Sequence, residues 1–468
     1  MSADSPEARD GAGEGARAGE GARAGDDTRA GEDARAGAPR TDTSGGAAGD
    51  TERAFKVVHL VHHYPPEFRG GTEACVETLA EAQHARGDRV VVIAGSDERD
   101  PKGRVDVSAV EHVLVCRLRR RPDENYSVDA RQPRVTEVIL EMLAAEAPDI
   151  VHLHHTLNLS GDLGARVAAA GHTVVSSLHD YTALCARHFL VRPDGEACAP
   201  QLPVPRARCH ACVLPDFPAG AEQLEHELAA KTEITRAELQ APALAVVPSE
   251  SVRRNWLASG LIDDARLHVL PHAVAGVAGP RPPERSRADG RLVIGTWGHL
   301  APAKGVLDLL AALRQANDPR LALLILGEPV DADHAGELLD AAEGLDVSFA
   351  GAFQPEDLRA VAEHIDVAAF PSRAEETFGL VVAEARALGL PVLCSDRGAL
   401  PESLGAAGAA LPAGDPSAWA AKLVELANDA STLASWRASA LLDLITPAKH
   451  ADAMAALYAR ALQRSPAP

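Results

Sequence analysis

The sequence has few aromatic residues, no long apolar run and a shortage of positive charge. Aromatic side chains make up 3% of its 468 residues, and 46 Lys and Arg stand against 67 Asp and Glu, a formal net charge of −21. Nucleic-acid binders hold phosphate backbones with clustered Lys and Arg, so nucleic acid is not an expected partner. No apolar run approaches the ~18 residues that cross a bilayer, and the N-terminus lacks the apolar core of a signal peptide. We therefore expect a cytoplasmic protein, in which the seven Cys stay reduced unless they bind metal.

The first 53 residues lack Val, Leu, Ile, Phe, Tyr and Trp, so they have almost nothing to bury. Between Gly13 and Ala36 a hexamer rich in Gly and Ala occurs four times, and Gly at this density opposes a helix. A hexapeptide period is also typical of β-helices, but those need an apolar residue in every turn. Residues 1–53 are therefore predicted to be a disordered tail. Their twelve acidic and seven basic side chains supply −5 of the net charge.

From Phe55 onward, apolar runs of strand length alternate with segments of helical period, which is typical of parallel βαβ units. The pattern predicts helices such as Thr72–Ala85 and Arg134–Ala145 in a first half whose strands are Lys56–Leu60, Arg89–Ala94, Asp149–Leu153, Thr173–Leu178, Ala243–Val247 and His268–Leu270. A second half has predicted strands at Arg291–Thr296, Leu321–Leu326, Val347–Phe349, Asp366–Phe370 and Pro391–Cys394.

This pattern predicts an α/β protein with two Rossmann-like domains facing each other across a cleft. We assign residues 54–279 to the first domain, the Pro- and Arg-rich residues 280–290 to a linker and residues 291–446 to the second domain. A helix over residues 447–468 is expected to return to the first domain. Ligands bind beyond the carboxyl ends of the strands in such sheets, so motifs at those positions carry most weight.

Three motifs follow predicted strands and open predicted helices. Gly70 and Gly71 let a backbone approach a phosphate closely, although a Gly pair before a helix is also a common turn. Lys304 can meet an anion at a helix mouth, or can be an exposed loop lysine. The third motif holds Glu376 and Glu384, which can line one pocket at its mouth and beneath it. No G-x-G-x-x-G follows the first strand, which argues against a nicotinamide or flavin site.

The third motif, PSRAEETFGLVVAEARALGLPVLCSD (Pro371–Asp396), resembles the signature of glycosyltransferase family 4, whose members are retaining enzymes of the GT-B fold. Further matches in the family's order are HHYPPEFRGGTE (His62–Glu73), DIVHLHH (Asp149–His155), SLHDY (Ser177–Tyr181), VVPSESV (Val246–Val252) and GHLAPAKG (Gly298–Gly305). Together they extend over nearly the whole chain after the tail.

The resemblance implies a donor site in the second domain and at its border with the first. Gly70 and Gly71 match the loop that lies against the donor's phosphates. Lys304 matches the lysine that neutralises the nucleoside diphosphate, and Glu384 matches the acid that holds the ribose hydroxyls. No catalytic metal is implied.

The reaction centre is carried over in the same way. Glu376 matches the acid near the transferred sugar, and the amides of Phe378 and Gly379 match the turn that binds the anion and the sugar. His179 matches the histidine of the first domain that hydrogen-bonds the donor sugar or the acceptor. No covalent nucleophile is evident, so a front-face displacement that retains the anomeric configuration is implied.

His299 departs from the family pattern, which usually has Arg at this place. Arg is always charged and bidentate toward phosphate, whereas His is mostly neutral at pH 7. Losing a charge-assisted hydrogen bond of about 1.5–3 kcal/mol weakens donor binding unless another cation, such as Arg69 or Arg373, substitutes.

The resemblance thus implies a glycosyltransferase that moves a sugar from a nucleotide-sugar donor, of the UDP or GDP type, to a glycan, lipid-linked or small-molecule acceptor. Surface polysaccharide or glycoconjugate synthesis is the expected setting, with peripheral contact to the inner face of the membrane as a further expectation. The alternatives are a catalytically impaired GT-B module that binds nucleotide or sugar, and a GT-B-fold epimerase.

Four cysteines lie in a predicted insertion at about residues 182–216: Cys185, Cys198, Cys209 and Cys212. A thiolate quartet that includes a C-x2-C pair suits tetrahedral Zn²⁺, so the spacing predicts a structural zinc. The four can instead stay reduced, form disulfides or hold another cluster.

Three other patterns have structural explanations. His152, His154 and His155 are interpreted as polar residues lining the cleft, with a metal site as the alternative. Asp331 is interpreted as a helix cap rather than a metal ligand. The run Arg117–Arg121 is either a solvated loop or a contact to an anionic lipid or a phosphorylated acceptor.

Overall fold

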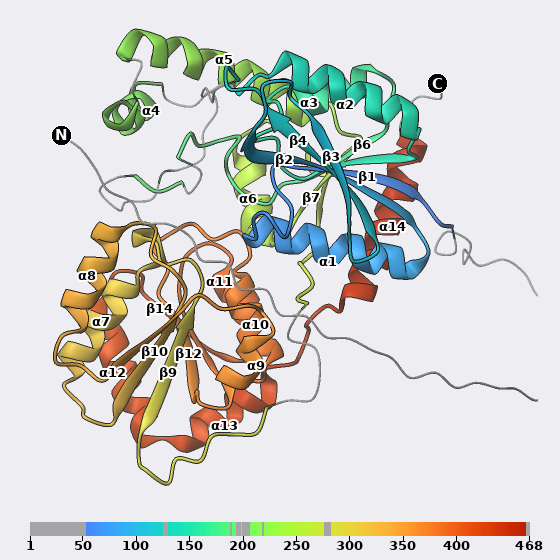
Figure 1. The fold of residues 1–468 in the computed structure, drawn as a ribbon. Coiled ribbons are helices and arrows are strands. Elements are labelled where there is room, and N and C mark those ends of the chain that lie inside the picture. The colour runs from blue at the N-terminus through green and yellow to red at the C-terminus, as the bar shows by residue number, and fades with distance from the viewer. Residues whose placement is uncertain are drawn as a thin grey trace, which may run out of the picture. The chain divides into compact units, whose positions relative to one another are not determined.

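In the computed structural model, the described residues are 53–124, 130–187, 190–192, 198, 206–217, 220–275 and 282–464. The predicted tail up to residue 52 lies outside them. The described chain contains two α/β sheets with helices on both faces of each (Figure 1).

The first sheet has eight strands in the order β3-β4-β2-β1-β5-β6-β7-β8, and all pairs except β3·β4 are parallel. Its strands are β1 (Lys56–Val61), β2 (Arg89–Arg99), β3 (Val105–Val110), β4 (Val113–Arg120), β5 (Ile150–Leu153), β6 (Val174–Ser177), β7 (Leu244–Val247) and β8 (Leu267–Val269). The accompanying helices are α1 (Gly71–Arg86), α2 (Pro133–Glu146), α3 (Leu163–Ala169), α4 (Arg206–Val213), α5 (Ala221–Gln240) and α6 (Glu250–Ala258).

The second sheet has six parallel strands in the order β11-β10-β9-β12-β13-β14. Its strands are β9 (Leu292–Trp297), β10 (Leu321–Leu326), β11 (Val347–Gly351), β12 (Val367–Phe370), β13 (Val392–Ser395) and β14 (Gly408–Leu411). Its helices are α7 (Val306–Ala316), α8 (Ala332–Ala342), α9 (Asp357–Ala362), α10 (Leu380–Ala387), α11 (Leu400–Leu404), α12 (Pro416–Asn428) and α13 (Ala430–Ser439). Asp331 caps α8 as predicted, because its carboxylate accepts a hydrogen bond from the His334 amide.

The strands are apolar along their length because helices cover both faces of each sheet. On one face of the second sheet, α7 and α12 bury Leu309 and Trp419 against Ile294, and on the other α10 buries Val382 against Phe370. The prediction of two Rossmann-like α/β domains is therefore confirmed, and every predicted strand is present within a few residues of its expected ends.

Three strands were not predicted: β3, β4 and β14. β4 contains most of the Arg117–Arg121 run, so the interpretation of this run as a solvated loop was wrong. Its charges are paired: Arg119 contacts Asp106 on β3 and Glu98 on β2, and Arg117 donates to the carbonyl of Pro65. These contacts let a charged segment stand as a strand of the sheet.

The helix α14 (Pro447–Arg464) packs against α1 and the first sheet, far from the second-domain helices that precede it in sequence. Its Tyr458 is fully buried, and the ring meets Phe55 edge-on with the centroids 5.8 Å apart. The hydroxyl lies 2.7 Å from His152 Nδ1 and accepts a hydrogen bond from the Gln83 amide at 3.0 Å. Within the described residues, no helix is both long enough and apolar enough to cross a membrane.

We expect Tyr458→Phe to lower the free energy of unfolding by about 1–3 kcal/mol, because it leaves buried polar groups of His152 and Gln83 without their partner. Denaturant unfolding measures this value. Asp452→Asn, at an exposed position of the same helix, is the matched control and should change stability by less than about 0.5 kcal/mol. Equal stability of the two variants would contradict the role of the hydroxyl.

Candidate active site

One pocket of about 540 Å³ lies at the carboxyl ends of strands from both sheets. Its walls come from the start of α1, the loops after β6, β9 and β12, and the start of α10. The structure brings to this pocket all nine residues predicted for catalysis and donor binding: Gly70, Gly71, His179, His299, Lys304, Glu376, Phe378, Gly379 and Glu384.

Glu376 and Lys304 form an ion pair in this pocket. Lys304 ends a short 3₁₀ turn after β9, and its Nζ donates to Glu376 Oε1 at 2.7 Å. Ser372 donates to the same oxygen at 2.7 Å. Burial alone would raise the pKa of Glu376, but the charge of Lys304 and the two hydrogen bonds outweigh it, so the pKa is lower than that of a free glutamate. Glu376 is therefore an anion at neutral pH.

Gly398 fixes the backbone of Glu376, a role that the sequence did not reveal. It has a φ of +56°, and a Cβ there would lie 2.1 Å from the Glu376 carbonyl oxygen. The following residue, Ala399, donates its amide to that same oxygen at 2.8 Å. Only glycine allows this approach. The loop after β13 therefore fixes the position of the Glu376 backbone, from which the carboxylate extends into the pocket.

Glu384 lies on α10 and accepts a hydrogen bond from the indole of Trp297 at 2.8 Å. Burial raises its pKa, although the indole bond opposes this shift. Trp297 ends β9 and is itself buried, so it orients the carboxylate from beneath the pocket. Sequence reasoning missed this partner because it is distant in the sequence from Glu384.

Two helices begin at the pocket. α1 starts at Gly71, which follows the capping residue Gly70, and the buried Glu73 accepts the Gly70 amide at 3.0 Å. α10 starts after Gly379, whose φ of +80° is a left-handed conformation that favours glycine. The first amides of both helices therefore border one space, where an anion would meet two positive helix ends.

His179 follows β6, and its backbone ties the first domain to the second. Thr377 donates its hydroxyl to the His179 carbonyl at 2.7 Å, and Ser249 donates to the Thr377 carbonyl at 2.9 Å. Burial lowers the pKa of His179 to about 4, so its imidazole is neutral at pH 7. Thr377 stands between the predicted residues Glu376 and Phe378, but its contact across the domains was not predicted.

The basic side chains in and near the pocket differ in their ion-pair partners and in their exposure. Arg373 is held in two hydrogen bonds by Asp308, so it is not placed to replace the arginine missing at position 299. Arg69 lines the pocket and is partly exposed, with Glu77 2.8 Å away. His299 lines the pocket and is exposed. Arg69 is therefore the better substitute of the two that the sequence suggested.

The interpretation of the strand-end histidines as cleft-lining residues was wrong for two of them. His152 is fully buried and His154 is 6% exposed, and neither borders the 540 Å³ pocket. His155 is partly exposed and contacts Asp180 at 3.0 Å. Buried partners from other elements satisfy the rings of His152 and His154, so they belong to the interior of the first domain.

The four cysteines of the insertion lie near one another, and all are partly buried free thiols. Cys209 and Cys212 are on one face of α4, three residues apart. Burial, followed by the charges of the other three cysteines, raises the pKa of Cys209 to about 12. Among the described residues, three groups of possible ligand atoms lie within 4.8 Å of one another, and none of them contains a sulfur of this quartet. None of the four lines the 540 Å³ pocket. Zinc binding by the quartet stays a prediction.

The sequence matches two families that together cover about three quarters of the chain. Residues 69–275 match the family described as Glycosyltransferase Family 4, and residues 291–429 match Glycosyl transferases group 1. D-inositol 3-phosphate glycosyltransferase of Jonesia denitrificans is 29% identical over 402 residues, which are 79% of this chain and 86% of that protein. Lipopolysaccharide 1,2-N-acetylglucosaminetransferase of Salmonella typhimurium is 34% identical over 115 residues, 22% of this chain and 30% of that enzyme.

Solved structures of the same fold extend over most of the chain. HepE of Anabaena in complex with UDP and glucose superposes with a TM-score of 0.60 at 18% identity, covering 86% of this chain and 99% of that one. Sucrose-phosphate synthase from Thermosynechococcus elongatus gives a TM-score of 0.63 at 20% identity, covering 86% and 98%. With both family matches in chain order and the GT-B fold in common, the protein belongs to the group 1, family 4 glycosyltransferases.

Proposed function

We propose that this glycosyltransferase moves a sugar from a nucleotide-sugar donor to a hydroxyl of a glycan, lipid-linked or small-molecule acceptor, with retention of the anomeric configuration. The observation that carries the proposal is the convergence of the nine predicted residues on one pocket, with the Lys304–Glu376 pair at its centre. A binding module without catalysis would not need both carboxylates and His179 at the same place.

A nucleotide-sugar donor is supported by the chemistry of the pocket and by related structures. The HepE structures contain UDP, UDP with glucose, or UDP-glucose. In this chain, Lys304 and the starts of α1 and α10 offer positive charge for a diphosphate, and Glu384 offers acceptor oxygens for ribose hydroxyls. A GDP donor would use the same phosphate contacts, so the base is decided by experiment.

The reaction follows from where charge develops. The bond between the anomeric carbon and the phosphate oxygen breaks, and the departing nucleoside diphosphate takes the electron pair. Lys304 and the helix amides stabilise this negative charge without a metal. The acceptor oxygen forms its bond to the anomeric carbon on the same face, and its proton passes to the departing phosphate. Glu376, near the sugar, stabilises the positive charge that develops on the ring.

We assign the acceptor to a second pocket of about 870 Å³, which adjoins the first and shares Arg69, Cys75 and Glu384 with it. Its other walls include α1 and the turn between β3 and β4, where Glu77, Glu81 and Glu111 line it. Burial raises the pKa of both Glu77 and Glu81. Carboxyl groups form hydrogen bonds with sugar hydroxyls, so we propose that a hydroxyl-bearing sugar enters here.

Synthesis of a surface polysaccharide or glycoconjugate in the cytoplasm, at the inner face of the membrane, is the setting that we propose. The named relatives that transfer sugar to inositol 3-phosphate and to lipopolysaccharide support a role in glycoconjugate assembly.

We also propose that the cysteine quartet binds a structural zinc ion. Two thiols on one face of α4 and two from the preceding segment offer four soft ligands. Zinc would deprotonate the thiols and would join segments that have little apolar surface. Without it, burial raises the pKa of Cys209 and Cys212.

We expect Glu376→Gln to lower kcat by about 100-fold or more, because it removes the charge that faces the sugar in the transition state. Steady-state assays with the donor identified by thermal-shift screening of nucleoside diphosphates and nucleotide sugars measure this effect. Glu384→Gln should instead raise the donor KM by about tenfold, and Glu425→Gln on an exposed face of α12 should change neither constant. Full activity of Glu376→Gln, or the absence of any stabilising nucleotide, would overturn the proposed function.

His299→Arg should tighten donor binding by about tenfold or more, because it restores a charge-assisted, bidentate contact to phosphate. Calorimetric titration with the nucleoside diphosphate measures the dissociation constant. His299→Gln tests whether loss of the imidazole alone has an effect, and we expect a smaller change. Unchanged affinity in the arginine variant would mean that position 299 does not face the phosphates.

Elemental analysis should find about one zinc per chain after purification without chelator, and Cys209→Ser should lose it. Cys394→Ala, at a buried cysteine of β13, is the control and should keep the metal. Zinc that persists in the Cys209→Ser protein would contradict the quartet site and would point to another group of ligands.

A further inference from the structure

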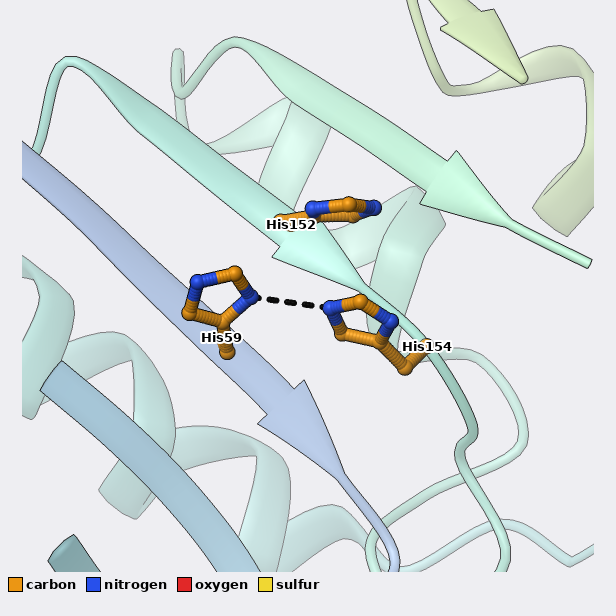
Figure 2. Close-up of side chains that lie close together, drawn as sticks. All are labelled: His59, His152 and His154. Atoms are coloured by element: carbon orange, nitrogen blue, oxygen red, sulfur yellow. Dashed lines mark hydrogen bonds between the residues drawn. The ribbon is translucent and has the colours of Figure 1, made fainter. Parts of the chain in front are cut away.

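A row of buried, hydrogen-bonded side chains runs behind the pocket and ends at His179. Gln83 Oε1, on α1, lies 2.8 Å from Nε2 of His59 on β1. His59 Nδ1 lies 2.8 Å from Nε2 of His154, which follows β5, and Figure 2 shows this contact. His154 Nδ1 lies 2.9 Å from Nε2 of His179. Four side chains from four different elements are thus joined end to end.

The three imidazoles of this row are neutral at physiological pH. Gln83 and His59 are fully buried, and His154 and His179 are less than a tenth exposed. Burial lowers the pKa of His59 to about 4, despite a hydrogen bond to Gln83 that opposes the shift, and the pKa of His154 falls well below its usual value. The pKa of His179 is about 4 for the same reason. Each ring therefore carries one N–H and one lone pair.

This single proton per ring gives the row a direction. The Gln83 oxygen can only accept, so His59 donates from Nε2 and keeps its lone pair on Nδ1. His154 must then donate from Nε2 to His59, and His179 must donate from Nε2 to His154. The lone pair of His179 consequently lies on Nδ1. Reversing the Gln83 amide would reverse every one of these bonds.

A second branch agrees with this orientation of the Gln83 amide. Gln83 Nε2 donates to the Tyr458 hydroxyl at 3.0 Å. That hydroxyl then donates to His152 Nδ1 at 2.7 Å, and His152 Nε2 donates to the Ser177 hydroxyl at 2.8 Å. Each of these three contacts pairs a donor with an acceptor, so this branch is compatible with the same orientation of the amide.

The same histidines also form a group that could hold a metal ion. Ring nitrogens of His59, His152 and His154 lie within 4.8 Å of one another (Figure 2). The nitrogens of His59 and His154 that face each other share one proton, and both nitrogens of His152 have hydrogen-bond partners. A metal would have to break these bonds in a fully buried place, so the hydrogen-bonded row is the better explanation of the group.

His179 is held firmly at the pocket end of the row. Thr377 binds its carbonyl at 2.7 Å, and its ring stacks on His272 with the centroids 5.0 Å apart and the planes 15° from parallel. Its Nδ1 is buried and has no hydrogen-bond partner among the described residues. A buried lone pair without a partner is costly, and His179 lines the pocket, so a substrate group can supply the missing donor.

We propose that Gln83, His59 and His154 are positioning residues that fix His179 in the tautomer with its proton on Nε2, so that Nδ1 accepts a hydrogen bond from a substrate hydroxyl. The identification of that substrate as a sugar rests on the proposed function. His179 then selects for a hydroxyl at this position, because a carbonyl or ether oxygen would place two acceptors against each other.

Nitrogen NMR of the full-length protein with ¹⁵N-labelled histidine tests the tautomer directly. The signals of His179 are assigned by their loss in His179→Asn, and we expect Nδ1 to be unprotonated and Nε2 to carry the proton. A protonated Nδ1 of His179 in the wild-type protein would overturn the proposal.

Substitutions at Gln83 test the origin of the tautomer. Gln83→Met removes the acceptor, so both tautomers of His179 should appear, and KM should rise about twofold or more with little change in kcat. Gln83→Glu keeps an acceptor oxygen and should preserve the wild-type tautomer. Ser177→Ala, on the other branch, is the matched control and should leave the His179 signals unchanged. Unaltered His179 signals in Gln83→Met would show that the row does not set the tautomer.

The NMR outcome is independent of the proposed function. A protein with the expected tautomer and no transferase activity would refute the sugar transfer and leave the row of hydrogen bonds intact. An active enzyme with the opposite tautomer would refute only the role of the row.

Discussion

The 540 Å³ pocket depends on one shared oxygen, Glu376 Oε1, to which both Lys304 and Ser372 donate at 2.7 Å. At this distance, partly exposed charges attract by a few kcal/mol, so the diphosphate of the proposed donor would compete with the carboxylate for the ammonium group. Ser372 keeps a hydrogen bond to Glu376 when Lys304 turns toward phosphate. Lys304 can therefore exchange the Glu376 carboxylate for a phosphate without leaving that buried carboxylate unpaired. This local arrangement allows an anion to bind although the chain as a whole is strongly acidic.

The residues of the pocket could be predicted because they follow strands, and the carboxyl ends of parallel strands meet at one edge. Lys304 and Glu376 are separated by 72 residues but stand after the neighbouring strands β9 and β12. Their supports could not be predicted in the same way. Three supports act through residues that are distant in the sequence: Trp297 contacts Glu384, Thr377 contacts His179, and Gly398 lies against the Glu376 carbonyl. No local sequence pattern encodes such long-range contacts.

The errors of sequence reasoning have physical reasons too. His152 alternates with apolar residues on β5, so its polarity suggested a place at the surface of a cleft. Its burial is possible only because Tyr458, 306 residues later, supplies a partner. β4 was missed because arginines interrupt its apolar pattern, while the acids that pair with Arg119 lie on the adjacent strands β2 and β3. β3 was missed because Asp106 and Ser108 break its short apolar run.

The position of α14 has a consequence for the biosynthesis of the protein. A ribosome makes the first sheet early, but Phe55 and the Gln83 amide receive their partner Tyr458 only after the entire second sheet has been translated. Until then, the nascent first domain exposes an apolar face and an unsatisfied polar group, which are features that chaperones bind. A chain that lacks α14 would still contain both sheets, but Phe55 and the Gln83 amide would lack Tyr458. The core of the first domain is therefore completed only after α14 has been translated.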